Sequence, residues 1–198
     1  METDQALLDA ARRMDKAALV RIFDLYSHTL YKYALRLCSD PMLADQIVGD
    51  VFVKLLDQIS AGNGPTAHLR SYLYEITYHR IIDEARYAQR RLPLEVTDWL
   101  PPGTDPAFLR LEDKLLFERI AQAIRDVLTH DQRHVIILRF LEEFSLRETA
   151  GILGKEVSHV KVIQGRAIAK LRGSLGEYKG TLRVPAPRTR IIPKTVGV

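Results

Sequence analysis

The stretch SLRETAGILGKEVSHVKVIQGRAIAKLRGSL, residues 145–175, decides the fold of the C-terminal part of the chain. Ser145 and Glu148 have the spacing of a capping box, which begins a short helix. Gly154 ends that helix, because glycine readily adopts a positive φ. A turn follows, and a second helix begins near residues 156–158 and continues to the end of the stretch. The arrangement is typical of a DNA-reading helix-turn-helix, although two amphipathic helices that pack on a neighbour have the same spacing.

Apolar residues at steps of three and four predict helices through most of the remaining chain. The predicted helices cover residues 16–38, 40–59, 67–91 and 107–128, and a shorter apolar stripe extends to Leu141. The clearest stripe, in the second of these helices, consists of Ala44, Ile47, Val48, Val51, Phe52, Leu55, Leu56 and Ile59. Neither the helical pattern at residues 107–128 nor the shorter stripe that extends to Leu141 contains strand-like alternation of any length. The predicted fold class is therefore all-α, in two small helical bundles.

A proline-rich segment interrupts the helical pattern near the middle of the chain. Residues 93–106, PLEVTDWLPPGTDP, contain four of the nine prolines. We interpret this segment as a flexible linker between two domains. The predicted units are a first helical domain, an acidic linker, a helix-turn-helix domain and a basic tail, at residues 1–92, 93–107, 108–178 and 179–198, respectively.

The composition is that of a soluble globular protein, with 198 residues, 46% of them hydrophobic and 27% charged. The sequence has no apolar run of about 18 residues, and its first ten residues are acidic, so we expect no membrane insertion, no signal peptide and a cytoplasmic location. The single cysteine, Cys38, excludes an internal disulfide. The six histidines are scattered, and no glycine-rich phosphate loop is present. We therefore expect no catalytic residue, no metal, no cofactor and no enzymatic activity.

The positive charge is concentrated at the C-terminal end. Residues 155–198 contain ten Lys or Arg residues and two acids, whereas the formal net charge of the whole chain is +4. A concentrated basic end favours a polyanionic partner, most often nucleic acid, although a solvated basic tail gives the same count.

The predicted helix at residues 67–91 combines basic and aromatic side chains, notably in HRIIDEARYAQRR at 79–91. Basic groups neutralise phosphates, and interleaved aromatic rings stack on unpaired bases. A solvated charged face of an amphipathic helix is the alternative.

These motifs together resemble one family. The segment LRETAGILGKEVSHVKVIQGRAIAKLR, residues 146–172, resembles the promoter-reading region of bacterial RNA polymerase sigma factors of the extracytoplasmic-function (ECF) class, in the sigma-70 family. Residues 25–56, LYSHTLYKYALRLCSDPMLADQIVGDVFVKLL, and residues 69–91 resemble region 2 of the same family. The motifs occur in the family's order and extend over about residues 18–175.

The resemblance implies a transcription initiation factor that binds core RNA polymerase, directs it to specific promoters and assists promoter melting. It also implies that an anti-sigma protein holds the free factor. The helix at residues 40–59 would dock on the polymerase clamp. The expected polymerase contacts are Asp45, Gln46, Asp50, Val51, Phe52 and Lys54. Val51 and Phe52 also belong to the apolar stripe, which suits core packing equally well.

The resemblance assigns promoter DNA to two helices. The helix at residues 69–91 would read and melt the minus-ten element, with contacts from Tyr74, Tyr78, His79, Arg80, Arg86, Arg90 and Arg91. The helix-turn-helix would read the minus-thirty-five element, with contacts from Ser158, His159, Lys161, Val162, Arg166 and Lys170.

The chain departs from the family pattern at several positions. Glu156 stands where a serine N-cap is frequent, Gly165 stands where a larger residue is frequent, and His79 stands where asparagine is frequent. The promoter sequence therefore does not follow from the family. The alternative function is a stand-alone helix-turn-helix regulator, which would bind duplex DNA without polymerase.

Overall fold

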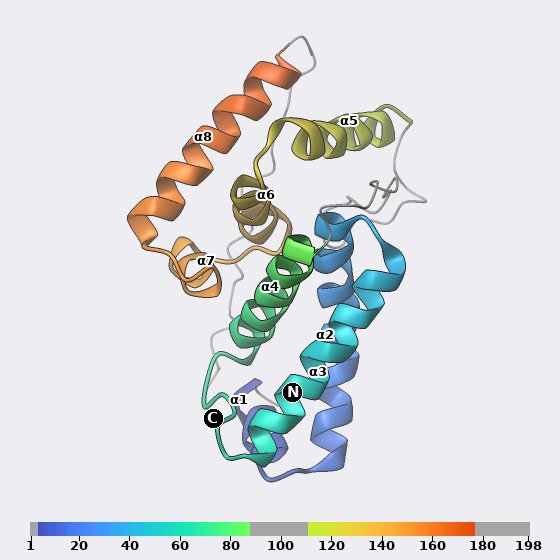
Figure 1. The fold of residues 1–198 in the computed structure, drawn as a ribbon, viewed down its shortest axis with the longest axis vertical. Coiled ribbons are helices and arrows are strands. Elements are labelled where there is room, and N and C mark those ends of the chain that lie inside the picture. The colour runs from blue at the N-terminus through green and yellow to red at the C-terminus, as the bar shows by residue number, and fades with distance from the viewer. Residues whose placement is uncertain (1–3, 88–110, 177–198) are drawn as a thin grey trace, which may run out of the picture.

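The computed structural model describes residues 4–87 and 111–176, and within these ranges every regular element is helical (Figure 1). The elements are α1 (Asp4–Arg12), α2 (Lys16–Cys38), α3 (Pro41–Ser60), α4 (Leu69–Tyr87), α5 (Leu111–Val127), α6 (His130–Ile136), the π-helical turn η2 (Ile137–Leu141), α7 (Leu146–Ile152) and α8 (Val157–Leu175). The all-α prediction is confirmed. The predicted linker at 93–107 and the predicted tail at 179–198 lie outside the described residues.

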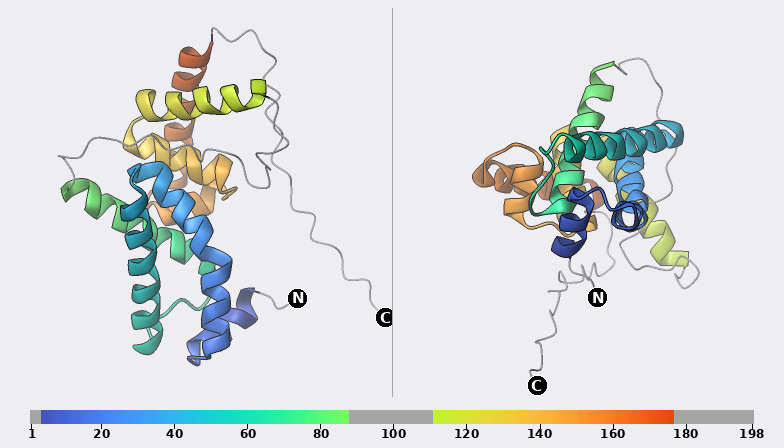
Figure 2. Two further views of the ribbon diagram at one scale, coloured as in Figure 1. Left: turned by 90° about the vertical axis from the view of Figure 1, so that its right-hand side faces the viewer. Right: turned by 90° about the horizontal axis from the view of Figure 1, so that it is seen from below.

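Helices α1 to α4 form the first bundle, in which α2 and α3 lie side by side (Figure 2). The Asp40 carboxylate accepts a hydrogen bond from the Leu43 amide at 3.1 Å, and Pro41 follows it at the start of α3. The cap agrees with the predicted start of this helix at residue 40. Proline suits the first helical position, because it has no N–H group that would be left unpaired there. Ile47 and Leu73 are among the side chains that fill the core of this bundle.

Helix α1 is an element that the apolar pattern did not predict. Its Leu7, Leu8 and Ala11 are buried, although the segment begins with polar residues. A reversal at Met14, with φ of 59°, joins it to the N-cap of α2 at Asp15. The helix has nine residues, of which three are buried. So short an apolar pattern cannot be distinguished in the sequence from an irregular polar terminus.

Helices α5 to α8 form the second bundle and contain the helix-turn-helix. The Ser145 amide donates to the Glu148 carboxylate at 2.7 Å, and the Glu148 amide donates to the Ser145 hydroxyl at 3.1 Å. Gly154 follows α7 with φ of 60°. The predicted capping box and the predicted glycine turn are both confirmed.

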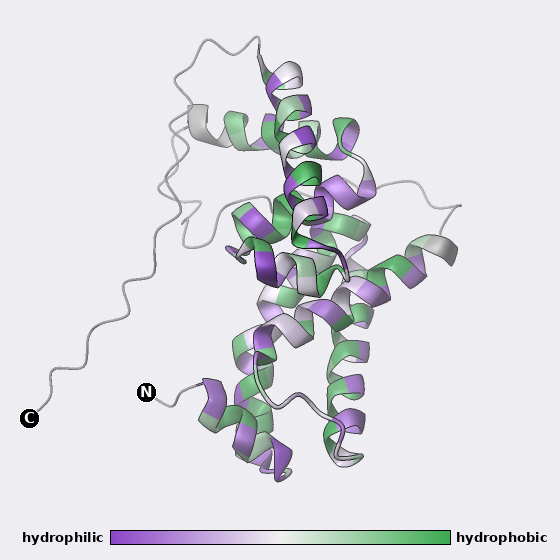
Figure 3. Cartoon of the chain, turned by 90° about the vertical axis from the view of Figure 1, so that its left-hand side faces the viewer, coloured by the Kyte–Doolittle hydropathy of each residue, from purple (hydrophilic) through white to green (hydrophobic). Residues whose placement is uncertain are grey.

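The two bundles pack against each other, which the sequence did not predict. Helix α4 contacts α7, and its inner face also meets residues of α6 (Figure 1). Hydropathy colouring shows polar and apolar residues interleaved along each helix, as expected for helices that bury one face (Figure 3). Buried residues of both bundles belong to one continuous core. In the part of the chain that the structure describes, no helix is long and apolar enough to cross a membrane.

Candidate nucleic-acid interface

The outer side of α8 carries every residue predicted for the minus-thirty-five element. Ser158, His159, Lys161, Val162, Arg166 and Lys170 are all exposed. Val160, Ile163 and Ala167 are buried on the opposite side, where α8 packs on α6 and α7. The second helix of the helix-turn-helix is therefore anchored by its apolar side and presents its polar side outward, as groove binding requires.

Two features of α8 modify this interface. The Lys170 ammonium lies 3.4 Å from the Val127 carbonyl at the C-terminal end of α5, so this lysine already has a local partner. Glu156 occupies the N-cap position but makes no side-chain capping hydrogen bond. The amide groups at the start of α8 are therefore not satisfied by their own cap, and an acid there still suits the helix dipole.

The residues predicted for the minus-ten element fall into two groups on α4. His79 is exposed and Arg80 is partly exposed. Arg80 pairs with Asp50 of α3 at 2.7 Å and with Glu84 at 2.6 Å. The hydrogen bond to Asp50 raises the pKa of Arg80, so its charge is held firmly. A predicted DNA contact and a predicted polymerase contact thus bind each other in this structure.

A small pocket lies beside this ion pair, between α3 and α4. Its volume is about 130 Å³, and it is lined by Asp50, Val51, Lys54, Ile76, His79, Arg80 and Asp83. The pocket therefore brings predicted polymerase contacts next to predicted DNA contacts. Among the described residues, no group of three or more His, Cys, Asp or Glu side chains could hold a metal ion.

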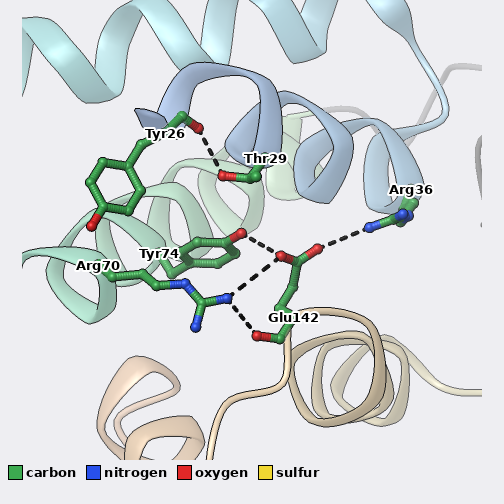
Figure 4. A network of polar contacts seen from close by, with 6 residues as sticks. All are labelled: Tyr26, Thr29, Arg36, Arg70, Tyr74 and Glu142. Carbon is green, nitrogen blue, oxygen red and sulfur yellow. Dashed lines mark hydrogen bonds and ion pairs between the residues drawn. The ribbon is translucent and has the colours of Figure 1, made fainter. Parts of the chain in front are cut away.

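Tyr74 and Tyr78 are buried, with exposed fractions of 0% and 8%. Tyr74 donates a hydrogen bond to the Glu142 carboxylate of the second bundle at 2.5 Å (Figure 4), and burial raises its pKa. The ring of Tyr78 packs edge-on against that of His134, with centroids 4.9 Å apart. In this arrangement neither tyrosine can stack on a base. The Arg86 side chain, Arg90 and Arg91 lie outside the described residues.

The residues predicted for polymerase binding lie on different sides of α3. Asp45, Gln46 and Lys54 are exposed, whereas Val51 is fully buried in the core. Phe52 is half-buried, and its ring lies 4.8 Å from that of Phe23 on α2. Val51 therefore contributes to packing in this structure.

Exposed apolar side chains beside Phe52 were missed by the sequence reasoning. Leu56 is 38% exposed although its spacing placed it in the buried stripe of α3, and Phe23 and Val20 on α2 are 48% and 60% exposed. We define Val20, Phe23, Phe52 and Leu56 as the apolar patch. Leu56 lies one turn from Phe52, and Val20 lies one turn from Phe23. Contiguous exposed apolar side chains are one feature of protein–protein interfaces.

A helix-turn-helix with an outward polar side, beside a second bundle with exposed apolar side chains, is the combination expected of a DNA-binding transcription factor with a protein partner. Family models agree: Sigma-70 region 2 matches residues 22–91, and Sigma-70, region 4 matches residues 126–173. ECF RNA polymerase sigma factor SigX of Bacillus subtilis (strain 168) is 30% identical over 156 residues, which cover 76% of this chain and 80% of SigX. The chain belongs to the ECF RNA polymerase sigma factors.

Two solved structures have the same fold. CnrH, in complex with the cytosolic domain of CnrY, superposes with a TM-score of 0.66 at 23% identity, covering 88% of this chain and 97% of CnrH. RpoE of Bartonella quintana, in complex with the anti-sigma factor NepR, gives a TM-score of 0.61 at 22% identity, covering 79% of this chain and 95% of RpoE.

Membership decides between the two functions that the sequence left open. The chain is a transcription initiation factor that directs RNA polymerase to promoters, and it is not a stand-alone regulator.

Proposed function

We propose that this sigma factor binds polymerase through α3 and the apolar patch, opens the minus-ten element through α4 and reads the minus-thirty-five element through α8. It acts in the cytoplasm, by binding alone, and catalyses no reaction of its own. The observation that carries this proposal is the outward side of α8, which holds all six predicted contacts on a helix anchored by its apolar side.

Polymerase binding is supported by the chemistry around the apolar patch. Phe23 and Phe52 contact each other and offer aromatic surface, which is the kind of side chain that dominates interface energies. Asp45 lies on the same helix and is exposed. An aromatic centre with an exposed carboxylate on the same helix fits a partner surface that has an apolar centre and a basic group beside it.

Promoter reading is supported by the order of side chains along α8. Ser158, His159 and Val162 lie in its first turns, which reach base edges when a recognition helix enters the major groove. Arg166 lies further along, where it reaches either guanine or phosphate. A bidentate contact between arginine and guanine contributes about 1–3 kcal/mol of discrimination.

The test is transcription by core RNA polymerase from a pool of genomic promoter fragments, with and without the purified chain. We expect factor-dependent transcripts from promoters that share a sequence. Arg166→Ala should weaken or shift this selection, whereas Lys16→Ala, at an exposed lysine at the start of α2, should leave it unchanged. Equal loss in both variants, or no factor-dependent transcript at all, would contradict the proposal.

The two structural neighbours were solved in complexes, CnrH with the cytosolic domain of CnrY and RpoE with the anti-sigma factor NepR. We propose that an anti-sigma protein also holds this chain when it is not in use. Such a protein must compete with core polymerase for the factor, and a competition binding assay with the purified pair would test that.

A further inference from the structure

The outward side of α8 carries an apolar residue among its polar groups. Val162 is 48% exposed, and it lies one turn after Ser158 and one turn before Arg166, both of which are exposed as well. The helical period places Val162 on the side that faces away from the buried Val160 and Ala167. The surface that we propose reads the promoter therefore has a valine between its polar side chains.

Neither core packing nor helix formation accounts for valine at position 162. Nearly half of the side chain is exposed, and its outward neighbours Gly165 and Ala169 are small and exposed too. A β-branched side chain is restricted in a helix, so valine forms helices less readily than alanine does. Single exposed apolar residues are ordinary on protein surfaces, so exposure alone assigns no role. The feature that does is the position of Val162 on the side that enters the groove.

The side-chain amide of α8 already has a partner within the protein. The Arg139 guanidinium of η2 donates to the Gln164 side-chain carbonyl at 3.0 Å. Glutamine can read adenine through a bidentate pair, in which that carbonyl accepts from the base. Gln164 is instead held toward η2 in this structure. Recognition of an A·T pair by this helix therefore falls to its other outward groups.

Thymine is the base that offers a valine an apolar partner. In the major groove adenine, guanine and cytosine present hydrogen-bond donors and acceptors, whereas thymine also presents its C5-methyl group. Against the other bases a valine covers polar edges without giving them a hydrogen bond, which carries a cost in free energy. A valine on a recognition helix therefore favours one base by attraction and disfavours the others by hydrogen bonds that are not made.

We propose that Val162 reads the methyl group of a thymine in the minus-thirty-five element, so that the promoters of this factor share an A·T pair at one fixed position. This inference rests on the proposed reading of that element by α8, and it names the chemistry of one contact. Val162 is then a specificity-determining residue. It contributes to the choice between sequences, whereas the basic side chains supply affinity that is independent of sequence.

The experiment changes the methyl group and the valine separately. Core RNA polymerase with the full chain is bound to a promoter selected in the transcription assay, and each thymine of the minus-thirty-five element is replaced in turn by deoxyuridine. Deoxyuridine keeps the base pair and lacks only the methyl group. With the parent chain, one of these replacements should weaken equilibrium binding about fourfold, as the loss of one buried methyl-sized contact implies.

Val162→Ala should bind the thymine and deoxyuridine promoters about equally, because the group that senses the methyl is gone. The matched control is Val157→Ala, which removes a 42% exposed valine from the same helix, about 140° around its axis. This control should keep the fourfold difference. In a promoter with a C·G pair at the same position, 5-methylcytosine in place of cytosine should strengthen binding by the parent but not by Val162→Ala.

Three results would overturn parts of this account, and they can be told apart. An equal response of Val162→Ala and Val157→Ala to deoxyuridine would remove the assignment to Val162, since the methyl group would then act through the shape of the duplex. Factor-dependent transcription with no deoxyuridine effect in the parent would overturn methyl reading and leave the proposed function in place. Absence of factor-dependent transcripts with the parent would overturn the proposed function itself.

Discussion

Two residues show how local geometry departs from what their types suggest. Gly165 lies on the outward side of α8, and a Cβ placed there would meet no other atom within 4 Å. Packing therefore does not require glycine at this position, although glycine weakens a helix.

His134 is fully buried. Its Nδ1 is hydrogen-bonded to the Tyr33 hydroxyl, and its Nε2 has no hydrogen-bond partner among the described residues.

Gly165→Ala should stabilise the protein. Alanine in a helix interior is favoured over glycine by about 1 kcal/mol, and the site has space for the added methyl group. Thermal denaturation should show a higher Tm. Gly154→Ala serves as the comparison and should lower Tm, because φ of 60° at residue 154 strains any side chain. A lower Tm for Gly165→Ala would mean that the helix does not continue through residue 165.

Stability should fall as the pH drops from about 7 toward 5.5, in part because of His134. Burial lowers the pKa of His134 well below its usual value, and the charges of His130, Arg133 and Lys155 lower it further. The unfolded chain then binds a proton near the reference pKa of about 6.5 that the folded chain does not, so stability is lost below that pH.

His134→Gln should flatten this pH dependence, as measured by urea denaturation at several pH values. His159→Gln, at an exposed position of α8, should keep the slope of the parent protein. An identical slope for His134→Gln would contradict the burial of a neutral imidazole.

At the scale of the element, side-chain caps fix the starts of three helices, α2, α3 and α7. Asp15, Asp40 and Ser145 each accept a hydrogen bond from an amide three residues further on. These caps occur in polar segments, where the spacing of apolar residues does not indicate where a helix begins. They are the reason that the starts of α3 and α7 could be predicted closely from the sequence.

Ser145→Ala should lower the free energy of unfolding by about 1 kcal/mol, because the cap of α7 and its reciprocal bond with Glu148 are lost. Ser174→Ala, near the exposed end of α8, should change it little. Chemical denaturation measures both. Equal stability of the two variants would show that the capping box does not hold the start of the helix-turn-helix.

Which residues are exposed was harder to predict than which elements form. The exposed side of α8 could be predicted from the helical period of its own sequence. The residues that anchor the helix, Val160, Ile163 and Ala167, all lie within it. Tyr74 and Tyr78 could not be placed in this way, since the surface that buries them comes from residues more than 50 positions away. Leu56 similarly belongs to the apolar period but lies at the edge of the packed face. Tertiary contact between bundles leaves no periodic signal in either segment.

At the scale of the whole molecule, the proposed function assigns different partners to the two bundles of one chain. The apolar patch lies on α2 and α3 of the first bundle, the recognition side of α8 belongs to the second, and the tyrosines of α4 lie between them. This separation means that polymerase binding and promoter reading can be disrupted independently.

Phe23→Ala should weaken binding to core polymerase by about 30-fold, as the loss of an interface hot spot of about 2 kcal/mol implies. Val162→Ala is the matched control: Val162 and Phe23 are both 48% exposed, but Val162 lies on the side of α8 that we propose reads DNA. Equilibrium binding to core polymerase without DNA measures both variants. Comparable affinities of the two variants for core polymerase would show that the apolar patch is not part of the polymerase interface.

The proposed function requires that one chain gives polymerase both promoter contacts, with α4 opening DNA where α8 has fixed the position. Footprinting a selected promoter with core polymerase and the full chain tests it most directly, by combining nuclease protection with permanganate reactivity of unpaired thymines. We expect protection at the minus-thirty-five element together with reactive thymines at the minus-ten element, both only when polymerase and factor are present. Protection of duplex DNA by the chain alone, with no reactive thymines when polymerase is added, would contradict it.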